Sequence, residues 1–288
     1  MADKNIHLWF ISDGKPGHIN QSLGLLEALQ RRIPNITWRE IPVMSACQAI
    51  RFARQHHTQC PNLVLSTGHR THLTLLILCK IMRVPSIVLM KPSLPFSWFD
   101  LCIIPEHDLP PARSNIITSM GPLNKIQPVA KEAGIGVILV GGPSKHFDWQ
   151  PEQFHAQLKA LIQQDPRNWT IATSRRTPDA TISLLRTLAL ANVTLVLAAE
   201  TDTNWLPRLL AKTELCWVTQ DSMSMIYEAL TAGCNVKLLD VPSRSENRLT
   251  HGIQKLQLSG YLSSDTKPPL KLAESDRCAE IIQQRFLS

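Results

Sequence analysis

The sequence predicts an α/β protein built from two Rossmann-like domains, on three observations. Apolar strand-like runs alternate with helical patterns along the chain, which is typical of βαβ units with mainly parallel sheets. The stretch Gly121 to Gly134 lacks a strand pattern and contains two prolines, and a new series of strands and helices follows it. Polar loops follow strand-like runs in both halves. We therefore expect domains at 1–121 and 135–263, joined by a linker at 122–134.

The expected strands are short apolar runs bounded by turn residues. In the first domain they are Ile6–Ser12, Ile36–Ile41, Asn62–Thr67, Ser86–Met90, Leu101–Ile104 and Asn115–Ser119. In the second domain they are Gly136–Val140, Trp169–Thr173, Val193–Ala198, Leu215–Thr219 and Asn235–Leu239.

The expected helices have apolar residues at helical spacing and lie between most of these strands. Their ranges are 19–31, 45–57, 70–82, 151–164, 178–190, 204–212, 222–232 and 246–257. After Ser263 a Lys-Pro-Pro turn and a last helix at about 272–286 form a tail. We expect this tail, residues 264–288, to pack back on the first domain.

Composition excludes several classes of protein. The chain has 288 residues, of which 44% are hydrophobic and 18% charged, so a large core is expected and a disordered chain is excluded. The N-terminal sequence MADKNIHLWFIS is interpreted as a strand and not as a signal peptide. The longest apolar segment, Leu73–Cys79, is too short to span a bilayer, so any membrane contact is expected to be peripheral.

The charge favours an anionic partner. The net charge is +7 and the pI is about 9.2, which suits nucleotide phosphates, nucleic acid or an anionic membrane surface. Nucleic acid is disfavoured because the chain has no arginine-rich run and no RNA-binding aromatic motif. The seven cysteines are scattered, odd in number and without a C-x-x-C pair, so we expect reduced thiols in a cytoplasmic protein.

The segment Trp217–Gly233 is predicted to be a strand end, a loop and a helix. Asp221 or Ser222 is the expected N-cap, and Gly233 is expected to end the helix. Asp221, Ser224 and Glu228 lie on the face opposite an apolar stripe. The stripe consists of Met223, Ile226, Tyr227 and Leu230. Such a helix is either an ordinary capped helix or one that offers polar groups and a positive N-terminus to phosphate.

The loop after the first strand is a candidate site because ligands of open α/β sheets bind beyond the carboxyl ends of strands. Asp13, Lys15, His18, Asn20 and Gln21 crowd polar groups into this glycine-containing loop. Its spacing is neither that of a Walker loop nor that of G-x-G-x-x-G. The alternative is a βα turn with incidental polar residues.

Two loops of the second domain are candidate phosphate sites. Gly142 and Ser144 follow the first strand of this domain and form a plausible phosphate cradle. Arg175 and Arg176 follow the next strand and could clamp a diphosphate, although paired arginines are also common on solvated surfaces. With the loop before Glu228, these loops are expected to converge on one nucleotide, with Glu228 on the ribose hydroxyls.

Other chemistries are disfavoured. The pairs His56-His57 and His69-x-x-His72 have no Cys or acidic partner at metal-ligand spacing, so surface or core histidines are expected. The chain contains no D-x-D sequence, which argues against a metal-bridged sugar nucleotide. It also contains no G-x-S-x-G elbow, which argues against a serine hydrolase.

Four segments together resemble one known family. They are DGKPGHINQS, GGPSKHFDW, TSRRTP and VTQDSMSMIYEA, and the resemblance extends in order from about Trp9 to Leu256. The chain thus resembles the mitochondrial-fission (elongated-mitochondria) family and its bacterial relatives, which are regarded as glycosyltransferases of GT-B type. The resemblance implies two Rossmann-like domains facing across a cleft, with the nucleotide-sugar donor on the second domain and the acceptor on the first. It also implies no bound metal or other cofactor.

Carried over residue by residue, the resemblance implies a donor site on the second domain and places the Asp13–Gln21 loop at the cleft. The implied donor-site residues are Gly142, Ser144, Arg175, Asp221, Ser222, Ser224 and Glu228.

The resulting hypothesis is a metal-independent glycosyltransferase that uses a nucleotide sugar. The acceptor expected from the resemblance is a cell-envelope glycan or glycolipid such as lipopolysaccharide core, reached from the cytoplasm, with peripheral contact to an anionic membrane. His18 is the first candidate for the base that deprotonates the acceptor hydroxyl, and Asp13 is the second. Two alternatives stay open: a non-catalytic adaptor on the same fold, and a sugar-nucleotide epimerase.

Overall fold

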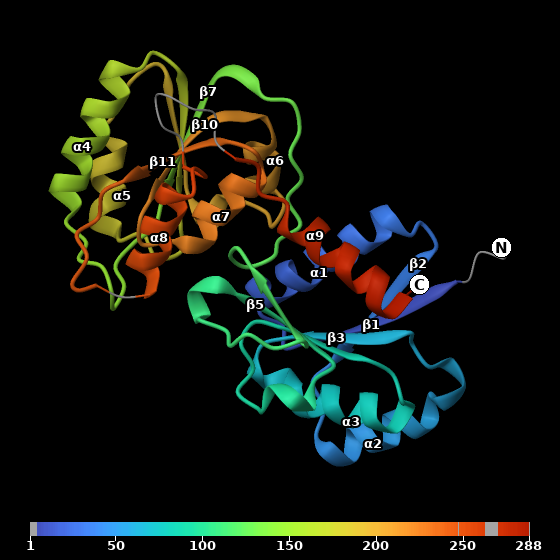
Figure 1. The fold of residues 1–288 in the computed structure, drawn as a ribbon. Coiled ribbons are helices and arrows are strands. Elements are labelled where there is room, and N and C mark those ends of the chain that lie inside the picture. The colour runs from blue at the N-terminus through green and yellow to red at the C-terminus, as the bar shows by residue number, and fades with distance from the viewer. Residues whose placement is uncertain (1–4, 247, 263–269, 288) are drawn as a thin grey trace. The chain divides into compact units, whose positions relative to one another are not determined.

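The computed structural model describes residues 5–246, 248–262 and 270–287, which form two compact units. Unit 1 contains the chain up to Lys125 and the residues from Ala273 onward, and unit 2 is Ile126–Leu272. Each unit is an α/β structure around one sheet (Figure 1). The Lys-Pro-Pro turn predicted for the tail lies outside the described residues.

The sheet of unit 1 has six strands in the order β2-β1-β3-β4-β5-β6, and every neighbouring pair is parallel. The strands are β1 Ile6–Ser12, β2 Ile36–Pro42, β3 Leu63–Thr67, β4 Ser86–Leu89, β5 Leu101–Pro105 and β6 Ile116–Ser119. Because all six run the same way, the loops that follow them share one edge of the sheet.

Helices cover both faces of this sheet (Figure 1). They are α1 Pro16–Arg32, α2 Ala46–Gln55, α3 His72–Met82 and α9 Glu274–Ile282. Leu8 and Phe10 of β1 point into a core shared with α1 and α9, whereas Trp9 and Ile11 point into the core under α2 and α3. This alternation along β1 is the period of two that a doubly covered strand requires.

The C-terminal helix α9 belongs to unit 1. Cys278, Ala279 and Ile282 are fully buried against the core of α1, and Ser275 Oγ donates to the carbonyl of Asn124 at 2.8 Å. At the surface, Arg31 and Asp276 pair at 2.6 Å. Short helical turns complete the unit: η1 His57–Gln59, η2 His69–Thr71, η3 Phe96–Trp98, η4 Glu106–Asp108 and the terminal π-helical turn η6 Gln283–Leu287.

The sheet of unit 2 has five parallel strands in the order β11-β10-β7-β8-β9. They are β7 Glu132–Val140, β8 Asn168–Thr173, β9 Val193–Val196, β10 Thr213–Thr219 and β11 Asn235–Leu239. The helices are α4 Pro151–Gln164, α5 Asp179–Arg186, α6 Trp205–Lys212, α7 Met223–Thr231 and α8 Arg248–Leu258, with a short turn η5 at Ala198–Glu200. In Figure 1, α4 and α5 lie on one face of the sheet, and α6 and α7 lie on the other.

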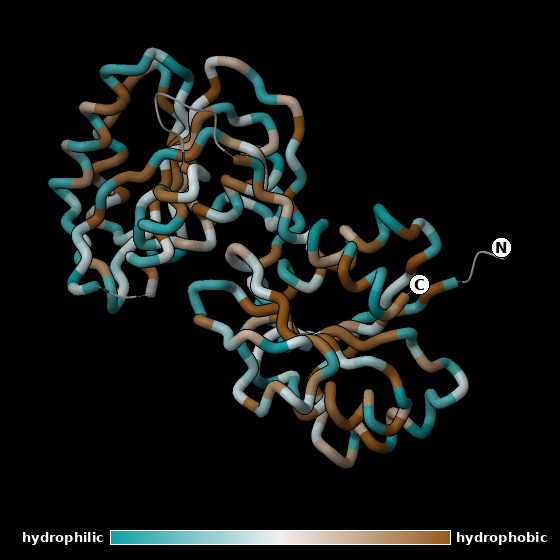
Figure 2. Tube along the Cα trace, in the orientation of Figure 1, coloured by the Kyte–Doolittle hydropathy of each residue, from teal (hydrophilic) through white to brown (hydrophobic). Residues whose placement is uncertain are grey.

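Each predicted strand and each predicted helix corresponds to an element of the structure. Hydrophobic residues run along the strands of both units (Figure 2). Helices cover both faces of each sheet, so side chains on both faces of a strand are buried and apolar. No helix within the described ranges is both long and apolar enough to cross a bilayer.

Part of the range 122–134, which was expected to be a linker, is regular structure or caps helices of unit 2. β7 begins at Glu132, which pairs with Thr213, so the last three residues of the expected linker are strand. Before them, Lys131 Nζ donates to the carbonyls of Leu210 at 2.9 Å, Ala211 at 2.8 Å and Ala232 at 2.5 Å. These carbonyls stand at the C-terminal ends of α6 and α7, so one ammonium group caps both helices.

Candidate functional site

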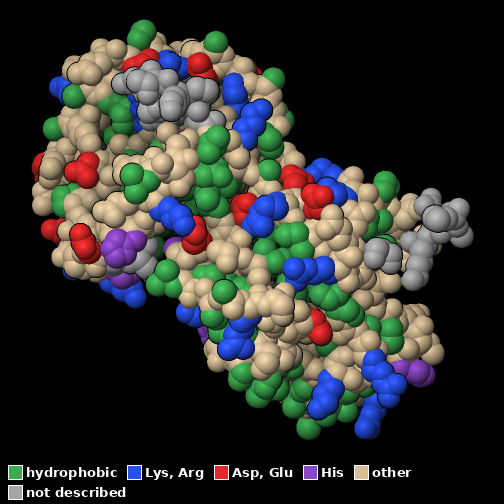
Figure 3. All heavy atoms as spheres, in the orientation of Figure 1, with side chains coloured by type: hydrophobic (Ala, Val, Ile, Leu, Met, Phe, Trp, Pro, Cys, Tyr) green, Lys and Arg blue, Asp and Glu red, His purple; other side chains and the backbone are tan. Residues whose placement is uncertain are grey.

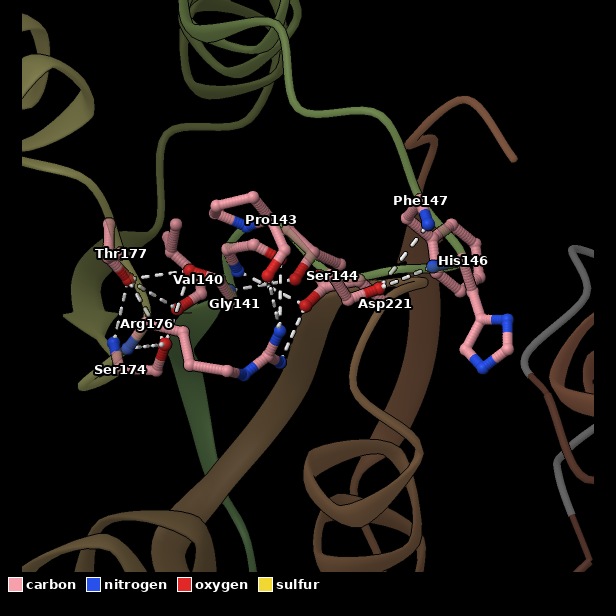
Figure 4. Close-up of polar contacts among 12 residues, drawn as sticks. Val140, Gly141, Pro143, Ser144, His146, Phe147, Ser174, Arg176, Thr177 and Asp221 are labelled. Carbon is pink, nitrogen blue, oxygen red and sulfur yellow. Dashed lines mark hydrogen bonds and ion pairs between the residues drawn. The ribbon is translucent and has the colours of Figure 1, made fainter. Parts of the chain in front are cut away.

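The loops after β7, β8 and β10 form a connected polar cluster in unit 2, centred on Asp221 (Figure 4). The Asp221 side chain is 0% exposed, and its Oδ2 accepts from Arg176 Nη2 at 2.6 Å and from the N–H of Gly142 at 3.1 Å. Arg176 also donates through Nη1 to the carbonyl of Gly142 at 3.0 Å. One carboxylate therefore ties the loop after β10 to the loops after β7 and β8.

The two glycines after β7 are required by this close packing. A Cβ at Gly141 would overlap the carboxylate of Asp221, and a Cβ at Gly142 would overlap the backbone carbonyl of Arg176. Neither position can accept a side chain without displacing the neighbouring loop. The loop after β7 is thus held in one position by its neighbours.

Three hydroxyl side chains that the sequence analysis did not single out complete the cluster. Thr177 Oγ1 donates to the carbonyl of Val140 at 3.0 Å, and Ser174 Oγ donates to that of Gly141 at 3.2 Å. Thr219 Oγ1 accepts from the N–H of Gly141 at 2.9 Å. In the sequence, these residues could have been found only by their place at or just after a strand end. That position does not show which group each hydroxyl binds.

Ser144 shapes the loop after β7. Its Oγ accepts from the N–H groups of His146 at 3.2 Å and Phe147 at 3.3 Å, which is the turn pattern of a short hydroxyl side chain. In Figure 4 the imidazole of His146 points away from the cluster around Asp221. Among the described residues the hydroxyl hydrogen of Ser144 has no acceptor, so the hydroxyl can still donate a hydrogen bond.

Two cations beside the cluster are exposed. Arg175 and Lys145 are exposed, and neither forms an ion pair with another described residue. The side chain of Arg176 is 42% exposed, but its guanidinium already binds the carboxylate of Asp221. Of the arginine pair predicted to hold a diphosphate, Arg175 is therefore the one with its charge unpaired among the described residues.

The N-terminus of α7 lies at the same edge of the sheet. Ser222 occupies the N-cap position, but its side chain makes no capping hydrogen bond, so the predicted side-chain cap is wrong. The carboxylate of Asp221, the other predicted cap, is bound by Gly142 and Arg176 instead. The first-turn N–H groups of α7 thus lack a side-chain acceptor among the described residues, as an anion-binding helix end does.

The other end of α7 closes as predicted. Gly233 has φ +78°, its N–H donates to Leu230 O at 3.0 Å, and the N–H of Cys234 donates to Ala229 O at 3.1 Å. This pair of bonds is a Schellman motif, which requires the left-handed conformation that glycine adopts without strain. On the helix itself Ser224 is exposed and Glu228 is partly buried. Burial raises the pKa of Glu228 to about 7.

In unit 1 the loop after β1 and the first turn of α1 hold a carboxylate–imidazole pair. Asp13 lies in the loop, whereas His18 lies in α1, which begins at Pro16, so the loop predicted at Asp13–Gln21 is wrong beyond Lys15. His18 Nδ1 lies 3.0 Å from Asp13 Oδ1 and 3.1 Å from Oδ2, and the two side chains are 18% and 1% exposed. Burial alone would raise the pKa of Asp13, but hydrogen bonds from the Lys15 N–H and from His18, together with the charges of His18 and Lys15, bring it below its ordinary value. With Nδ1 facing the carboxylate, Nε2 is the ring nitrogen left to accept a proton.

Gly68, directly after β3, supports the imidazole from behind. It has φ +88°, and a Cβ at this position would overlap the ring of His18. The ring of His18, in the first turn of α1, is therefore held between Asp13 in the loop after β1 and the backbone of Gly68 in the loop after the adjacent strand β3.

The remaining predicted residues of this loop differ in exposure. The Lys15 side chain is 52% exposed, with Nζ 3.9 Å from Asp13 Oδ2. Asn20 is partly buried, and Gln21 is 9% exposed on the inner side of α1. Next to Gln21, Ser22 and Thr67 share a buried hydrogen bond of 2.8 Å. Lys15 thus reaches solvent, whereas Gln21 mainly packs within the unit.

The two histidine pairs that the sequence disfavours as metal ligands lie outside both polar clusters. His56 stacks on Phe52 with ring centroids 4.1 Å apart. His72 is 2% exposed, and burial, with a smaller effect of the nearby His69, lowers its pKa to about 4. Among the described residues no group of three or more His, Cys, Asp or Glu side chains is arranged to hold a metal ion.

Comparison with known proteins agrees with this architecture. Residues 16–286 match the family model described as Mitochondrial fission ELM1. The chain is also similar to the uncharacterized protein RP120 of Rickettsia prowazekii (strain Madrid E), with 22% identity over 311 residues that cover 86% of each chain.

Two solved structures show the fold. The UDP-GlcNAc 2-epimerase of Methanocaldococcus jannaschii has a TM-score of 0.59 and 11% identity, covering 97% of this chain and 100% of that one. The ADP-heptose lipopolysaccharide heptosyltransferase II of E. coli has a TM-score of 0.52 and 12% identity, covering 92% of this chain and 88% of that one. The predicted fold class, two Rossmann-like domains of GT-B type, is confirmed.

Proposed function

The chain belongs to the Mitochondrial fission ELM1 family, and from this premise we propose that it is a glycosyltransferase that takes its sugar from a nucleotide-sugar donor. The observation that carries the proposal is the cluster in unit 2, where Asp221 holds three strand-end loops together. Beside it lie cations and a helix N-terminus that have no ion pair and no side-chain cap within the part of the chain that the structure describes. Nucleotides bind at such edges of Rossmann-like sheets, because backbone N–H groups and cations there meet the phosphates.

In the proposed donor complex, each polar group has a distinct role. The first turn of α7 and the exposed guanidinium of Arg175 bind the diphosphate. Gly142, whose α-carbon packs against the backbone of Arg176, keeps the loop after β7 against the loop after β8. Ser144, Ser222 and Ser224 supply further donors at the same edge. Glu228 accepts from the ribose hydroxyls. Asp221 does not touch the ligand in this arrangement but positions Arg176 and the N–H of Gly142.

In the proposed reaction, a hydroxyl of the acceptor attacks the anomeric carbon, and the bond from that carbon to the phosphate oxygen breaks. His18 Nε2 takes the hydroxyl proton, while Asp13 holds the imidazole through Nδ1 and stabilises its charged form. The nucleoside diphosphate leaves with the bonding electron pair, stabilised by Arg175 and the helix N-terminus. The nucleotide sugar is a substrate here, and the scheme needs no further cofactor.

The proposed acceptor is a glycan or glycolipid of the cell envelope, with lipopolysaccharide core as the first to test, met from the cytoplasmic face of the membrane. The support for this class is the similarity of the fold to the ADP-heptose LPS heptosyltransferase II of E. coli.

An epimerase is the second candidate, favoured by the similarity to a UDP-GlcNAc 2-epimerase over the whole of that chain. The two reactions differ in their need for an acceptor. An epimerase converts a nucleotide sugar alone, whereas a transferase releases nucleoside diphosphate only in proportion to acceptor, apart from slow hydrolysis.

The decisive experiment has two stages. Calorimetry with UDP, ADP and GDP, each against its nucleoside, should show binding that depends on the diphosphate and is weakened by Arg175→Ala. The protein is then incubated with sugar derivatives of the nucleotide that binds, with and without lipopolysaccharide core acceptors. The products are identified by mass spectrometry. Absence of nucleotide binding would favour the adaptor instead, and epimerised sugar without acceptor would favour the epimerase.

A further inference from the structure

The charge of this chain is concentrated in one part of unit 1. Residues 41–99 contain six Lys or Arg and no Asp or Glu, whereas the whole chain has a net charge of +7. The remainder of the chain is therefore nearly neutral. Helices α2 and α3 both lie in this segment and pack side by side over one face of the unit 1 sheet (Figure 1).

No exposed side chain of these two helices is acidic, and besides Gln48 and Gln55 of α2 most of the large exposed ones are cationic or apolar. We define the α2–α3 face as the exposed residues Arg51, Arg54, Leu73, Lys80, Ile81 and Arg83. None of its four cations forms an ion pair with a described residue. In Figure 3, lysine and arginine side chains lie over this end of unit 1, with hydrophobic side chains between them.

Helix α3 is apolar on both sides, which is unusual for a helix that has one side in water. Its inner side, including Leu75 and Leu78, is fully buried in the core under the sheet. On its outer side Leu73 is 54% exposed and Ile81 is 40% exposed. Leu76 and Ile77, between them, are only partly buried. The outer side of α3 thus exposes apolar side chains that could pack in an apolar environment.

The neighbouring helix α2 supplies a place for an anionic headgroup. Arg51 and Arg54 line a shallow surface depression together with Cys47, Ile50 and Gln55. Two guanidinium groups one turn apart beside an apolar floor match a phosphate whose attached chains continue into an apolar layer.

We propose that the α2–α3 face binds peripherally to bilayers that contain anionic phospholipids. Cations on the face attract the anionic headgroups, and Leu73 and Ile81 enter the boundary between headgroups and acyl chains. This occupant suits the face better than a second copy of the chain, because pairing the face with itself would bring its own positive charges together. Nucleic acid would leave the exposed leucine and isoleucine without an apolar partner.

The inference rests on unit 1 alone and does not depend on the proposed reaction, because binding to lipid is measured without a substrate. The test is sedimentation of the full chain with vesicles of phosphatidylglycerol and phosphatidylcholine, compared with vesicles of phosphatidylcholine alone, at low and high salt. We expect binding to the anionic vesicles that weakens with salt. Arg51→Gln with Arg54→Gln should weaken it about tenfold or more.

The apolar contribution is tested separately. Leu73→Gln with Ile81→Gln should remove the binding that persists at high salt. The matched controls lie on unit 2: Lys159→Gln with Arg186→Gln removes two exposed cations from α4 and α5, and Leu258→Gln replaces an exposed leucine of α8. These controls should bind vesicles as the wild type does.

Three results would overturn the proposal. The first is no binding to anionic vesicles at low salt, and the second is equal weakening by the unit 2 controls, which would indicate a general charge effect. The third is evidence that the face binds a different partner. In that case the α2–α3 variants would abolish a dimer seen by light scattering, or RNA binding seen in gel shifts, and would leave vesicle binding unchanged.

Discussion

Arg176 Nη2 lies 2.6 Å from Asp221 Oδ2, and the two residues, 45 positions apart in the chain, lie in the loops after β8 and β10, the strands on either side of β7. The Asp221 side chain is 0% exposed and the Arg176 side chain is 42% exposed, so the pair reaches from inside unit 2 to its surface. The second partner of Asp221 is the backbone N–H of Gly142. The two contacts of Asp221 therefore help to hold the loops after β7, β8 and β10 together, along with the hydroxyl bonds of Ser174, Thr177 and Thr219.

The first prediction concerns the stability of this cluster. Asp221→Ala leaves the N–H of Gly142 and the inner side of Arg176 without their acceptor, and should lower the free energy of unfolding of unit 2 by about 1–3 kcal/mol. Urea titration, with hydrogen exchange read on peptides from unit 2, measures this loss of unfolding free energy. In the variant, the backbone N–H groups of the loop after β7 should lose their protection from exchange first.

A matched control is the surface pair Arg244–Asp148, 3.5 Å apart with side chains 58% and 54% exposed. Asp148→Ala should change stability by about 1 kcal/mol or less, as exposed ion pairs do. Equal effects of the two substitutions would show that Asp221 is no more than a surface partner, contrary to its burial.

The positions of the strands and of the site loops could be predicted from the sequence for a physical reason. Parallel strands covered on both faces are continuous apolar runs such as Ile138 to Val140, which stand out from amphipathic helices. The carboxyl ends of parallel strands share one edge, so polar residues directly after them must lie near one another. That rule brought Gly142, Arg176 and Asp221 together before their contacts were known.

The roles within the site could not be predicted, because they depend on pairings between distant residues. Asp221 has the sequence pattern of an N-cap, yet its carboxylate binds Arg176 and Gly142, which are far away in the chain. Lys131 lay in the expected linker, yet its ammonium group caps α6 and α7. Gly68 was not singled out, because only the structure shows the His18 ring against it.

The second prediction concerns pH. Burial raises the pKa of Glu228 from 4.5 to about 7, so the folded state keeps a proton that the unfolded chain loses between these values. The stability contributed by that proton is fully present below pH 4.5 and is lost as pH rises to about 7. Glu228→Gln should remove this fall and leave unit 2 more stable than the wild type at pH 7 and above by up to about 3 kcal/mol.

The measurement is urea unfolding of both proteins across this pH range. Glu152→Gln on α4 replaces an exposed carboxyl and serves as the control for losing one carboxyl. Parallel pH profiles for wild type and Glu228→Gln would mean that Glu228 does not titrate differently in the folded state. Nucleotide affinity measured on the same samples separates the effect on stability from a role at the ribose.

The third prediction compares two glycines of α1. A Cβ at Gly24 would overlap the backbone of Asn124, which cannot move as a side chain can. Gly24→Ala should therefore destabilise unit 1 by about 1–3 kcal/mol, the usual cost of overpacking. Gly17 lies in the first turn of the same helix and has open space around it. Gly17→Ala should be neutral or stabilising by up to about 1 kcal/mol, because alanine favours helix.

Thermal unfolding of the two variants side by side provides the measurement, and each serves as the control for the other. The same loss of stability for both would mean that helix geometry, and not the contact with Asn124, decides the result.

The last prediction concerns Asp13 and His18 under the proposed reaction. His18→Ala removes the imidazole and should lower turnover by about 10²–10⁴-fold, the usual effect of losing a general base. Nucleotide affinity should stay nearly unchanged, because the proposed donor contacts all belong to unit 2. His18→Gln keeps hydrogen bonding without basicity, so its turnover should be as low as that of His18→Ala.

Asp13→Asn tests how the imidazole is held. Because the Asp13 carboxylate accepts from His18 Nδ1 at 3.0 Å, the amide should hold the ring poorly in the tautomer that leaves Nε2 free. Turnover should fall while nucleotide affinity persists. His56→Gln, which changes a histidine stacked on Phe52 outside the loop, should retain activity. High activity in His18→Gln would show that His18 is structural and would transfer the role of base to Asp13, whose own lowered pKa makes it a weak one.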